Sequence, residues 1–336
     1  MTTFMLAASG TALARPFTDA GGRTVEIPDD VSRVLAAGPP ASVLVYVLAP
    51  EKLIGWARKP SEQEKEFLMP AVQDLPTFGR LTGESSTASM AAVLAARPDL
   101  IIDVGTVDDT YVSLADKVQE QTGIPYVLID GSLAKTPESL RQVGELLGVS
   151  ARAEELAAYA ENTLGTLDEG IAGIPAAERP KVYYGRGPEG LETGLAGSIN
   201  LEILEAVGAT NVAAAAGRGG LTDVSLEQVI GWNPQIVLAA SPKFAETARS
   251  DPRWANVAAV KAGRVYQAPS LPFGWFESPP GVNRLIGVRW LEALLYPATF
   301  PVDLRADVKQ FFKLYYQVDL TETQLDTLLK DATARP

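Results

Sequence analysis

Aromatic and arginine side chains follow several predicted strands, where they could bind a bulky, partly anionic ligand. Tyr184 and Arg186 close and follow a strand predicted over 181–184, and Trp275 and Phe276 lie in a loop rich in proline and glycine. Aromatic rings stack on flat ligands, and guanidinium groups make charge-assisted hydrogen bonds to anions. The candidate ligand-binding residues are Pro39, Pro40, Phe78, Arg80, Thr106, Tyr184, Arg186, Trp275 and Phe276.

The same side chains also have purely structural interpretations. Successive strand residues face opposite sides of a sheet, so one of Tyr183 and Tyr184 must point into the core. Trp275 and Phe276 could equally pack under their loop, and an arginine is most often a solvated surface residue. A shared site is nevertheless favoured, because ligands of doubly wound sheets bind outside the carboxyl ends of the strands. The metal-binding residues are left open, with Tyr184 as one candidate for direct ligation of iron.

The composition excludes several classes of chemistry. The 336-residue chain contains no histidine and no cysteine. A nucleophile paired with histidine, thiolate redox chemistry and a zinc site of His and Cys ligands are therefore impossible. The net charge of −12 argues against nucleic acid or an anionic membrane surface as a main partner.

Residues 185–190 (GRGPEG) match the dinucleotide-binding pattern G-x-G-x-x-G but lack its context. That pattern needs a helix that opens within the glycines, so that the helix N-terminus faces a pyrophosphate. Here Pro188 lies inside the motif, and helix signals begin only near Ser198. An enzyme that uses a nucleotide or a sugar is therefore kept only as the alternative function.

One segment occurs twice and indicates two lobes of similar plan. Residues 89–104 (SMAAVLAARPDLIIDV) recur as residues 225–240 (SLEQVIGWNPQIVLAA). Each copy predicts a short helix, a break before the proline and a buried strand of continuous aliphatic residues, as parallel sheets require. Two such lobes would leave a cleft between them, which is a natural place for a ligand.

A long helix is predicted between the lobes. From Ser150, a good N-cap, to about Ile171 there is no proline, and apolar residues recur at helical spacing. At 1.5 Å per residue the helix would be about 30–35 Å long. Strands predicted over 33–37, 53–57 and 124–130 alternate with helices in the first half. We therefore expect an α/β fold with an N-terminal lobe over 15–149, a connecting helix over 150–174 and a C-terminal lobe with C-terminal helices over 175–336.

The first residues predict the remnant of an export signal. Residues 1–14 (MTTFMLAASGTALA) are small, apolar and uncharged, and they end in an A-x-A cleavage pattern. The alternative is a disordered, alanine-rich tail, because no basic residue precedes Arg15. No cysteine that could carry a lipid follows, and no apolar run reaches the roughly 18–20 residues of a membrane span. We expect export to a periplasm without a lipid anchor.

Further segments carry a family pattern that extends over the chain from about Pro16. They are residues 19–28 (DAGGRTVEIP), the repeated segment above, residues 251–266 (DPRWANVAAVKAGRVY) and residues 283–297 (NRLIGVRWLEALLYP). In this combination the chain resembles the class III substrate-binding proteins of ABC importers, which are receptors for ferric siderophores, haem, cobalamin and metal oxyanions. The resemblance implies two Rossmann-like lobes joined by a single long backbone helix, small closure motions and docking of each lobe on a permease dimer.

The resemblance also implies docking by a surface glutamate on each lobe. Glu227 matches that position in the second lobe, whereas the repeat places Ala91 at the equivalent position of the first. Glu84, in the preceding loop, is the candidate substitute. Glu227 also has the simpler interpretation of a solvated helix residue.

The expected function is that of a periplasmic, non-enzymatic receptor that delivers an iron complex, or a related metal-bearing anion, to an ABC importer. The expected partners are an iron chelate, haem, a corrinoid or a metal oxyanion as ligand and the permease dimer, with no nucleic acid and no cofactor. The protein is expected to be a monomer. Besides the enzyme, the remaining alternative is a permease-regulating scaffold without a ligand, which Ala91 makes less remote.

Overall fold

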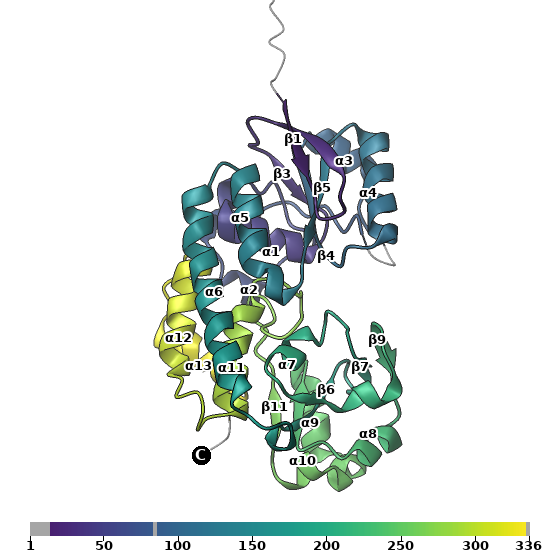
Figure 1. The fold of residues 1–336 in the computed structure, drawn as a ribbon, viewed down its shortest axis with the longest axis vertical. Coiled ribbons are helices and arrows are strands. Elements are labelled where there is room, and N and C mark those ends of the chain that lie inside the picture. The colour runs from purple at the N-terminus through teal and green to yellow at the C-terminus, as the bar shows by residue number, and fades with distance from the viewer. Residues whose placement is uncertain (1–13, 83–85, 334–336) are drawn as a thin grey trace, which may run out of the picture.

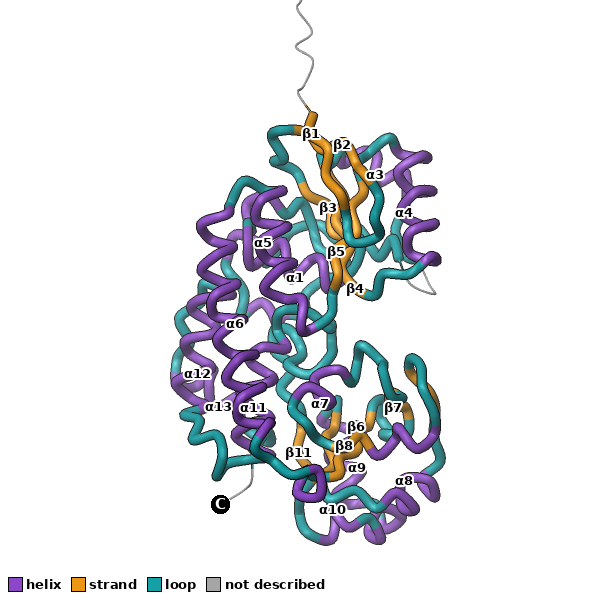
Figure 2. Tube along the Cα trace, in the orientation of Figure 1, coloured by secondary structure: helices purple, strands orange, loops and turns teal. Residues whose placement is uncertain are grey.

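The computed structural model describes residues 14–82 and 86–333 and contains two α/β lobes beside a set of long helices (Figure 1). The strands fall into separate groups, one in each lobe, and helices run along one side of both lobes (Figure 2). The predicted two-lobe α/β architecture with parallel sheets is therefore confirmed.

The first lobe is built on a parallel sheet in the order β3–β4–β5, with the antiparallel hairpin β1–β2 beside it. Strand β4 can be continuously aliphatic because Leu100 and Ile102 face a core that includes α1, while Ile101 faces residues of α4. Its elements are β1 (Ala14–Thr18), β2 (Thr24–Pro28), β3 (Val34–Ala36), α1 (Pro39–Leu48), α2 (Glu62–Lys65), α3 (Met90–Ala96), β4 (Leu100–Gly105), α4 (Asp109–Thr122), β5 (Tyr126–Asp130) and α5 (Thr136–Leu146), with short 3-10 turns at Pro50–Lys52, Pro70–Val72 and Leu133–Lys135.

The second lobe is built on a parallel sheet in the order β11–β10–β6–β8, with the antiparallel pair β7–β9 at its side. Its elements are β6 (Lys181–Gly185), β7 (Glu192–Gly194), α7 (Glu202–Ala206), β8 (Thr210–Asn211), β9 (Leu221–Asp223), α8 (Leu226–Trp232), β10 (Ile236–Ala239), α9 (Pro242–Ser250), α10 (Ala258–Lys261) and β11 (Val265–Gln267), with 3-10 turns at Ala176–Glu178, Val212–Ala216 and Pro252–Asn256.

The sequence repeat is also a structural repeat. The side chain of Ser89 caps α3 and that of Ser225 caps α8, each by accepting from the N–H three residues on. Both helices end in a left-handed residue, Arg97 at φ 47° and Asn233 at φ 49°, just before the proline. Strands β4 and β10 then follow in the central part of each sheet.

The long helices form a spine that contacts both lobes. It consists of α6 (Ser150–Ala172), α11 (Arg284–Leu295), α12 (Leu304–Phe311), a π-helical turn (Phe312–Tyr316) and α13 (Glu322–Leu329). Helix α6 has 23 residues and packs against α5 and α11. Its N-cap is Val149, one residue before the expected Ser150.

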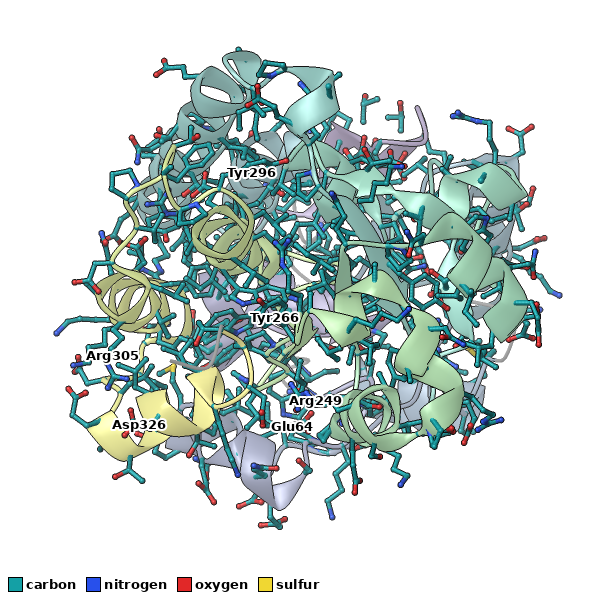
Figure 3. All side chains as sticks on the ribbon, turned by 90° about the horizontal axis from the view of Figure 1, so that it is seen from below. Glu64, Arg249, Tyr266, Tyr296, Arg305 and Asp326 are labelled. Atoms are coloured by element: carbon teal, nitrogen blue, oxygen red, sulfur yellow. The ribbon has the colours of Figure 1, made fainter. Side chains whose placement is uncertain are left out.

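The C-terminal part of the spine returns to the first lobe. The hydroxyl of Tyr46 in α1 donates to the carbonyl oxygen of Tyr316 at 2.7 Å, and the Gln324 amide donates to that of Glu66 at 2.8 Å. Exposed ion pairs such as Arg305–Asp326 join α12 to α13 on the outer face (Figure 3). The spine thereby fixes how far the lobes lie apart on that side.

The sequence predicted an export signal over residues 1–14 and a strand over residues 53–57. The strand predicted over 53–57 is wrong: only single bridges form, from Val34 to Leu53 and from Trp56 to Thr77. The expected export signal lies outside the described residues, except that Ala14 begins β1. Within the described part of the chain, no helix has the length and apolar character that crossing a membrane requires.

Candidate functional site

Three cavities lie between the lobes. One, with a volume of about 430 Å³, lies between Thr106 of the first lobe and Glu202 of the second. The larger of the other two, here called the interlobe cleft, has a volume of about 320 Å³ and is lined by residues of both lobes. The smaller, here called the first-lobe pocket, has a volume of about 180 Å³ and shares Pro39, Pro40, Arg80 and Pro280 with the cleft. The interlobe cleft is lined by Pro39, Pro40, Ser42, Val43, Trp56, Arg58, Arg80, Asn200, Phe273, Glu277, Ser278, Pro279 and Pro280.

The N-terminus of α1 borders the interlobe cleft. Pro39 and Pro40 occupy its first two positions, where a missing N–H costs nothing. The buried Ser42 hydroxyl donates to the Gly38 carbonyl at 3.3 Å and accepts from the Ala57 N–H at 3.2 Å, which ties the helix start to the next loop. Aligned peptide dipoles place partial positive charge at a helix N-terminus, so the cleft has a potential that favours an anion.

Two arginines of the first lobe line the cleft, and one of them is paired with a carboxylate. Arg58 is exposed and forms a two-pronged ion pair with Glu64, at 2.6 and 3.1 Å. Arg80 is exposed as well, and its backbone carbonyl accepts hydrogen bonds from residues 86–88, which fixes this loop. Guanidinium groups present forked donors that match the oxygens of an anion.

The second lobe contributes a buried polar cluster of Tyr184, Arg186 and Glu277. The Arg186 Nε donates to Glu277 at 2.9 Å, and its Nη1 donates to Glu192 at 2.6 Å. The Tyr184 hydroxyl donates to the same Glu277 oxygen at 3.1 Å. Burial raises the pKa of Tyr184 well above its usual value, so this residue is a neutral donor rather than a phenolate. Glu277 is the member of this cluster that lines the cleft. Its charge is thus offset by Arg186, which does not itself line the cleft.

The floor of the cleft is aromatic and rigid. Trp56 is 2% exposed and Phe273 is 7% exposed, and their ring centroids lie 6.1 Å apart. The Trp56 indole donates to the Val72 carbonyl at 2.7 Å, and Tyr46 and Tyr316 pack behind the two rings. The planes of the two rings are tilted by 45° to each other, so they form an apolar but not a flat surface.

A buried carboxyl group faces the first-lobe pocket. Asp103 accepts a hydrogen bond from the Tyr126 hydroxyl at 3.0 Å and is 7% exposed. Burial raises the pKa of Asp103 to about 6, because the hydrogen bonds it accepts only partly offset desolvation. The charge of this pocket therefore changes in the physiological pH range.

The predicted ligand-binding residues separate into three groups. Pro39, Pro40 and Arg80 line the interlobe cleft, and Thr106 lines the first-lobe pocket. Tyr184 and Arg186 lie behind the cleft wall and reach it through Glu277. Phe78, Trp275 and Phe276 are absent from the lining of either cavity.

Those three aromatic residues pack against the protein itself. Phe78 is half-buried beside Gly55, and Phe276 stacks on Tyr184 with centroids 3.9 Å apart. Trp275 is fully buried, and its backbone lies so close to α11 that a Cβ at Gly287 would clash with it. Trp275 and Phe276 were expected to bind ligand. In this structure they are core residues, which agrees with the alternative that they pack under their loop.

Ten of the thirteen residues that line the interlobe cleft were not predicted from the sequence, among them Trp56, Arg58, Asn200, Phe273 and Glu277. Phe273 and Glu277 flank the predicted pair Trp275 and Phe276, so the loop was identified but not the side chains that face the cleft. Trp56 is the last but one residue of the strand predicted over 53–57, and its position near the end of that segment was the available signal. Arg58 and Asn200 lie in loops without a pattern.

The residues expected to dock a permease lie on small surface helices. Glu227 is exposed in the first turn of α8, where its own backbone N–H and the Ser225 hydroxyl lower the pKa of its carboxyl. Ala91 is exposed at the equivalent place in α3. Glu84 lies outside the described residues.

Neither a metal centre nor a dinucleotide loop is formed by the described residues. Among them, no three acidic side chains are arranged to hold a metal ion. The segment 185–190 is followed by strand β7 rather than by a helix, and Arg186 pairs with Glu192 across this turn. The helix N-terminus that a pyrophosphate requires is therefore missing from this loop.

Comparison with known proteins gives a consistent result. A family model described as "Periplasmic binding protein" matches residues 55–271. The molybdate-binding protein MolA of Haemophilus influenzae is 26% identical over 333 residues, which cover 92% of this chain and 93% of that protein. The uncharacterized ABC transporter substrate-binding lipoprotein YvrC of Bacillus subtilis is 22% identical, with 84% of this chain and 85% of that protein covered.

Solved structures agree with these matches. An ABC transporter solute binding protein from Sulfurospirillum deleyianum is 30% identical with a TM-score of 0.85, and the match covers 94% of this chain and 99% of that chain. The MolA structure bound to molybdate has a TM-score of 0.75 at 23% identity, with 91% of this chain and 99% of that chain covered. The chain therefore belongs to the periplasmic binding protein family, the class III substrate-binding proteins of ABC importers.

Proposed function

We propose that this protein binds a small metal oxyanion of the molybdate type in the interlobe cleft and delivers it to an ABC importer. The observation that carries the proposal is the convergence of Arg58, Arg80 and the N-terminus of α1 on one cavity. All three contribute positive potential, and they lie on the same lobe.

The neutralised wall of the second lobe supports an anionic ligand. Among the described residues, Glu277 is the only acidic one in the lining of the cleft. Arg186 and Tyr184 both donate to it, which spreads its charge and lowers its repulsion of an anion. Asn200 and Ser278 add polar groups on the same side of the cleft.

The size of the cleft and the relatives support a small ligand. A volume of about 320 Å³ is at the lower end of the roughly 300–1,000 Å³ typical of small-molecule sites. A tetrahedral oxyanion fits such a cavity together with bound water. MolA is described as a molybdate-binding protein, and its alignment with this chain covers most of both proteins.

An anionic iron chelate is the second candidate ligand. The aromatic floor of Trp56 and Phe273 favours it, because the apolar part of a chelator can pack against the exposed edges of these rings. In that case the chelator would hold the metal, and Arg58 and Arg80 would bind negatively charged groups of the chelator. The Tyr184 hydroxyl, which donates to Glu277, would then take no part in ligating iron.

The receptor role also includes export and docking. We infer that the mature protein acts as a monomer in the periplasm and that Glu227 contacts the permease. Proteins of this family are receptors rather than enzymes, so the nucleotide- or sugar-dependent enzyme is not pursued. The helix-free loop at 185–190 supports that choice.

A ligand screen tests the proposal. Intrinsic tryptophan fluorescence, with Trp56 in the cleft floor as the reporter, would be followed during titration with molybdate, tungstate, sulfate, a ferric siderophore and haemin. We expect saturable quenching by molybdate and tungstate, and loss of that quenching when Trp56 is changed to Phe while calorimetry still detects binding. Binding of the ferric siderophore alone would favour the second candidate and contradict the first.

A further inference from the structure

A buried arginine connects the two lobes beside the interlobe cleft. Arg284, the first residue of α11, donates through Nη2 to the carbonyl oxygen of Gly131 at 2.5 Å and through Nη1 to Glu202 at 2.7 Å. Glu202 begins α7 of the second lobe and accepts from the backbone N–H of Leu133 at 2.9 Å. Gly131 and Leu133 belong to the first-lobe segment that follows β5.

These hydrogen bonds form a closed network that links the two lobes. One arm joins Arg284 to the first lobe directly, and the other reaches it through Glu202. Two further carbonyls of the second lobe, those of Gly281 and Ile199, accept weaker bonds from the same guanidinium. Arg284 thus donates four hydrogen bonds at the contact between the lobes, and Glu202 accepts a further one there from Leu133.

Because this arginine is buried, breaking its hydrogen-bond network would cost free energy. Arg284 is 0% exposed, and the Glu202 side chain is 28% exposed toward a cavity shared by both lobes. If the lobes separated, the Gly131 carbonyl and the Leu133 N–H would lose their partners, and the guanidinium would lose part of its compensation for desolvation. A charge buried in this way therefore favours a single separation of the lobes.

We propose that Arg284 and Glu202 are positioning residues that latch the lobes together and thereby set the width of the interlobe cleft. The expected effect of the latch on ligand affinity rests on the proposed function. Its expected effect on the separation of the lobes does not. The spine holds the lobes together on one side, and the latch holds them at the cavity that Glu202 lines, beside the interlobe cleft. Cleft walls kept at one separation retain an anion longer, because its partners need not be assembled at each binding event.

Arg289 provides a matched control on the same helix. It is also largely buried and paired, but with Glu292 of α11 and Asp307 of α12. All three residues belong to the spine, so Arg289 crosses no boundary between the lobes. A loss of stability is expected from substitution of either arginine, but only the loss of Arg284 should change the separation of the lobes.

The absence of cysteine allows this separation to be measured directly. Cysteines introduced at Ala91 of α3 and Gly231 of α8, which are both exposed, would carry nitroxide labels for distance measurement by pulsed electron resonance. The test variants are Arg284→Met and the double variant Arg284→Met/Glu202→Leu, in which no unpaired charge is left buried. The control is Arg289→Met, and circular dichroism confirms that each labelled protein is folded.

We expect the double variant to broaden the distance distribution and to shift its mean by more than about 2 Å, the scale of a domain rearrangement. The control should keep the original distribution. In a parallel stopped-flow experiment the apparent Kd for molybdate should rise about tenfold in the double variant, as it does when the binding-competent state falls to a tenth of the population.

An unchanged distance distribution in the double variant would overturn the latch, and so would equal broadening in the Arg289→Met control. If the protein with both lobes labelled but otherwise unsubstituted does not bind molybdate, the proposed ligand fails. The distance measurement would still decide on the latch, because it needs no ligand.

Discussion

Arg186 and Glu277 form an ion pair at 2.9 Å that joins the end of β6 to the loop lining the interlobe cleft. The pair is asymmetric, because Glu277 faces the cleft while Arg186 lies behind it and also binds Glu192. A negative charge in the wall of an anion site is thereby held by a positive charge from the second lobe. The two residues should consequently have opposite effects on ligand affinity.

Substitution of this pair tests the sign of the electrostatics. Glu277→Gln removes a negative charge from the cleft, and we expect the Kd for molybdate to fall on the order of fivefold. Arg186→Gln leaves the nearly buried Glu277 without its partner, and we expect weaker binding together with a loss of about 3 kcal/mol in the free energy of unfolding. Calorimetric titration and urea unfolding measure both effects; changes of the same sign in the two Kd values would refute this electrostatic role.

The first-lobe pocket should make binding depend on pH. Because burial raises the pKa of Asp103 to about 6, this group gains its negative charge as the pH rises through that value, and anion affinity should then fall by roughly fivefold. Asp103→Asn should remove this part of the pH dependence. The Kd values of the unsubstituted protein and the Asp103→Asn variant are measured at pH 5 and pH 7.5. They are compared at each pH, so that changes in the ligand itself cancel. An identical dependence of Kd on pH in both proteins would exclude a role for Asp103.

The spine contains a second buried carboxyl group, which should affect stability rather than binding. Burial raises the pKa of Glu292 to about 7, although Arg289 opposes that shift. The folded state therefore binds the proton more tightly than the unfolded state, so the contribution to stability is complete below about pH 4.5 and is lost as the pH rises through 7.

Glu292→Gln should flatten this dependence. Relative to the variant, we expect the unsubstituted protein to lose about 2 kcal/mol of unfolding free energy between pH 5 and pH 8. Urea unfolding at both pH values measures the difference. A relative gain in stability over the same range would show that Glu292 is ionised throughout in the folded state.

Docking on a permease should depend on one lobe more than on the other. Glu227 is exposed in α8, whereas the equivalent position in α3 is Ala91. We expect Glu227→Ala to reduce uptake of the ligand in cells without changing its Kd, and Ala91→Glu to leave the Kd unchanged as well. The exposed helix residue Glu246 of α9 supplies the control variant, Glu246→Ala. Uptake that is unaffected by the Glu227 substitution would remove this residue from the docking surface.

Local sequence patterns predicted the parts of the fold that local chemistry determines. Ser89 and Ser225, each followed by a short helix and a proline, gave both copies of the repeated unit, and the proline-free stretch after Ser150 gave α6. Pro39 and Pro40 were placed correctly at the cleft because a helix starting after a parallel strand must begin at the carboxyl edge of the sheet.

The remaining parts of the site depend on long-range packing. Within the loop after β11, nothing local indicates that Trp275 points inward and Glu277 outward. The approach of the Trp275 backbone to α11 needs Gly287, because a Cβ at that position would clash with it, and such a long-range contact cannot be read from the loop itself. The strand expected over 53–57 does not form, and only isolated bridges hold that segment to its neighbours.

The most direct test of the account is calorimetric titration of the purified protein and of the double variant Arg58→Ala/Arg80→Ala with molybdate. Each charge-assisted hydrogen bond contributes about 1.5–3 kcal/mol, so the double variant should bind at least about 100-fold more weakly. A control with the exposed, cleft-distant substitution Arg253→Ala should retain the original affinity. Saturable binding of molybdate that is lost only in the double variant is the predicted result, and equal affinity in all three proteins would contradict an anion site in the interlobe cleft.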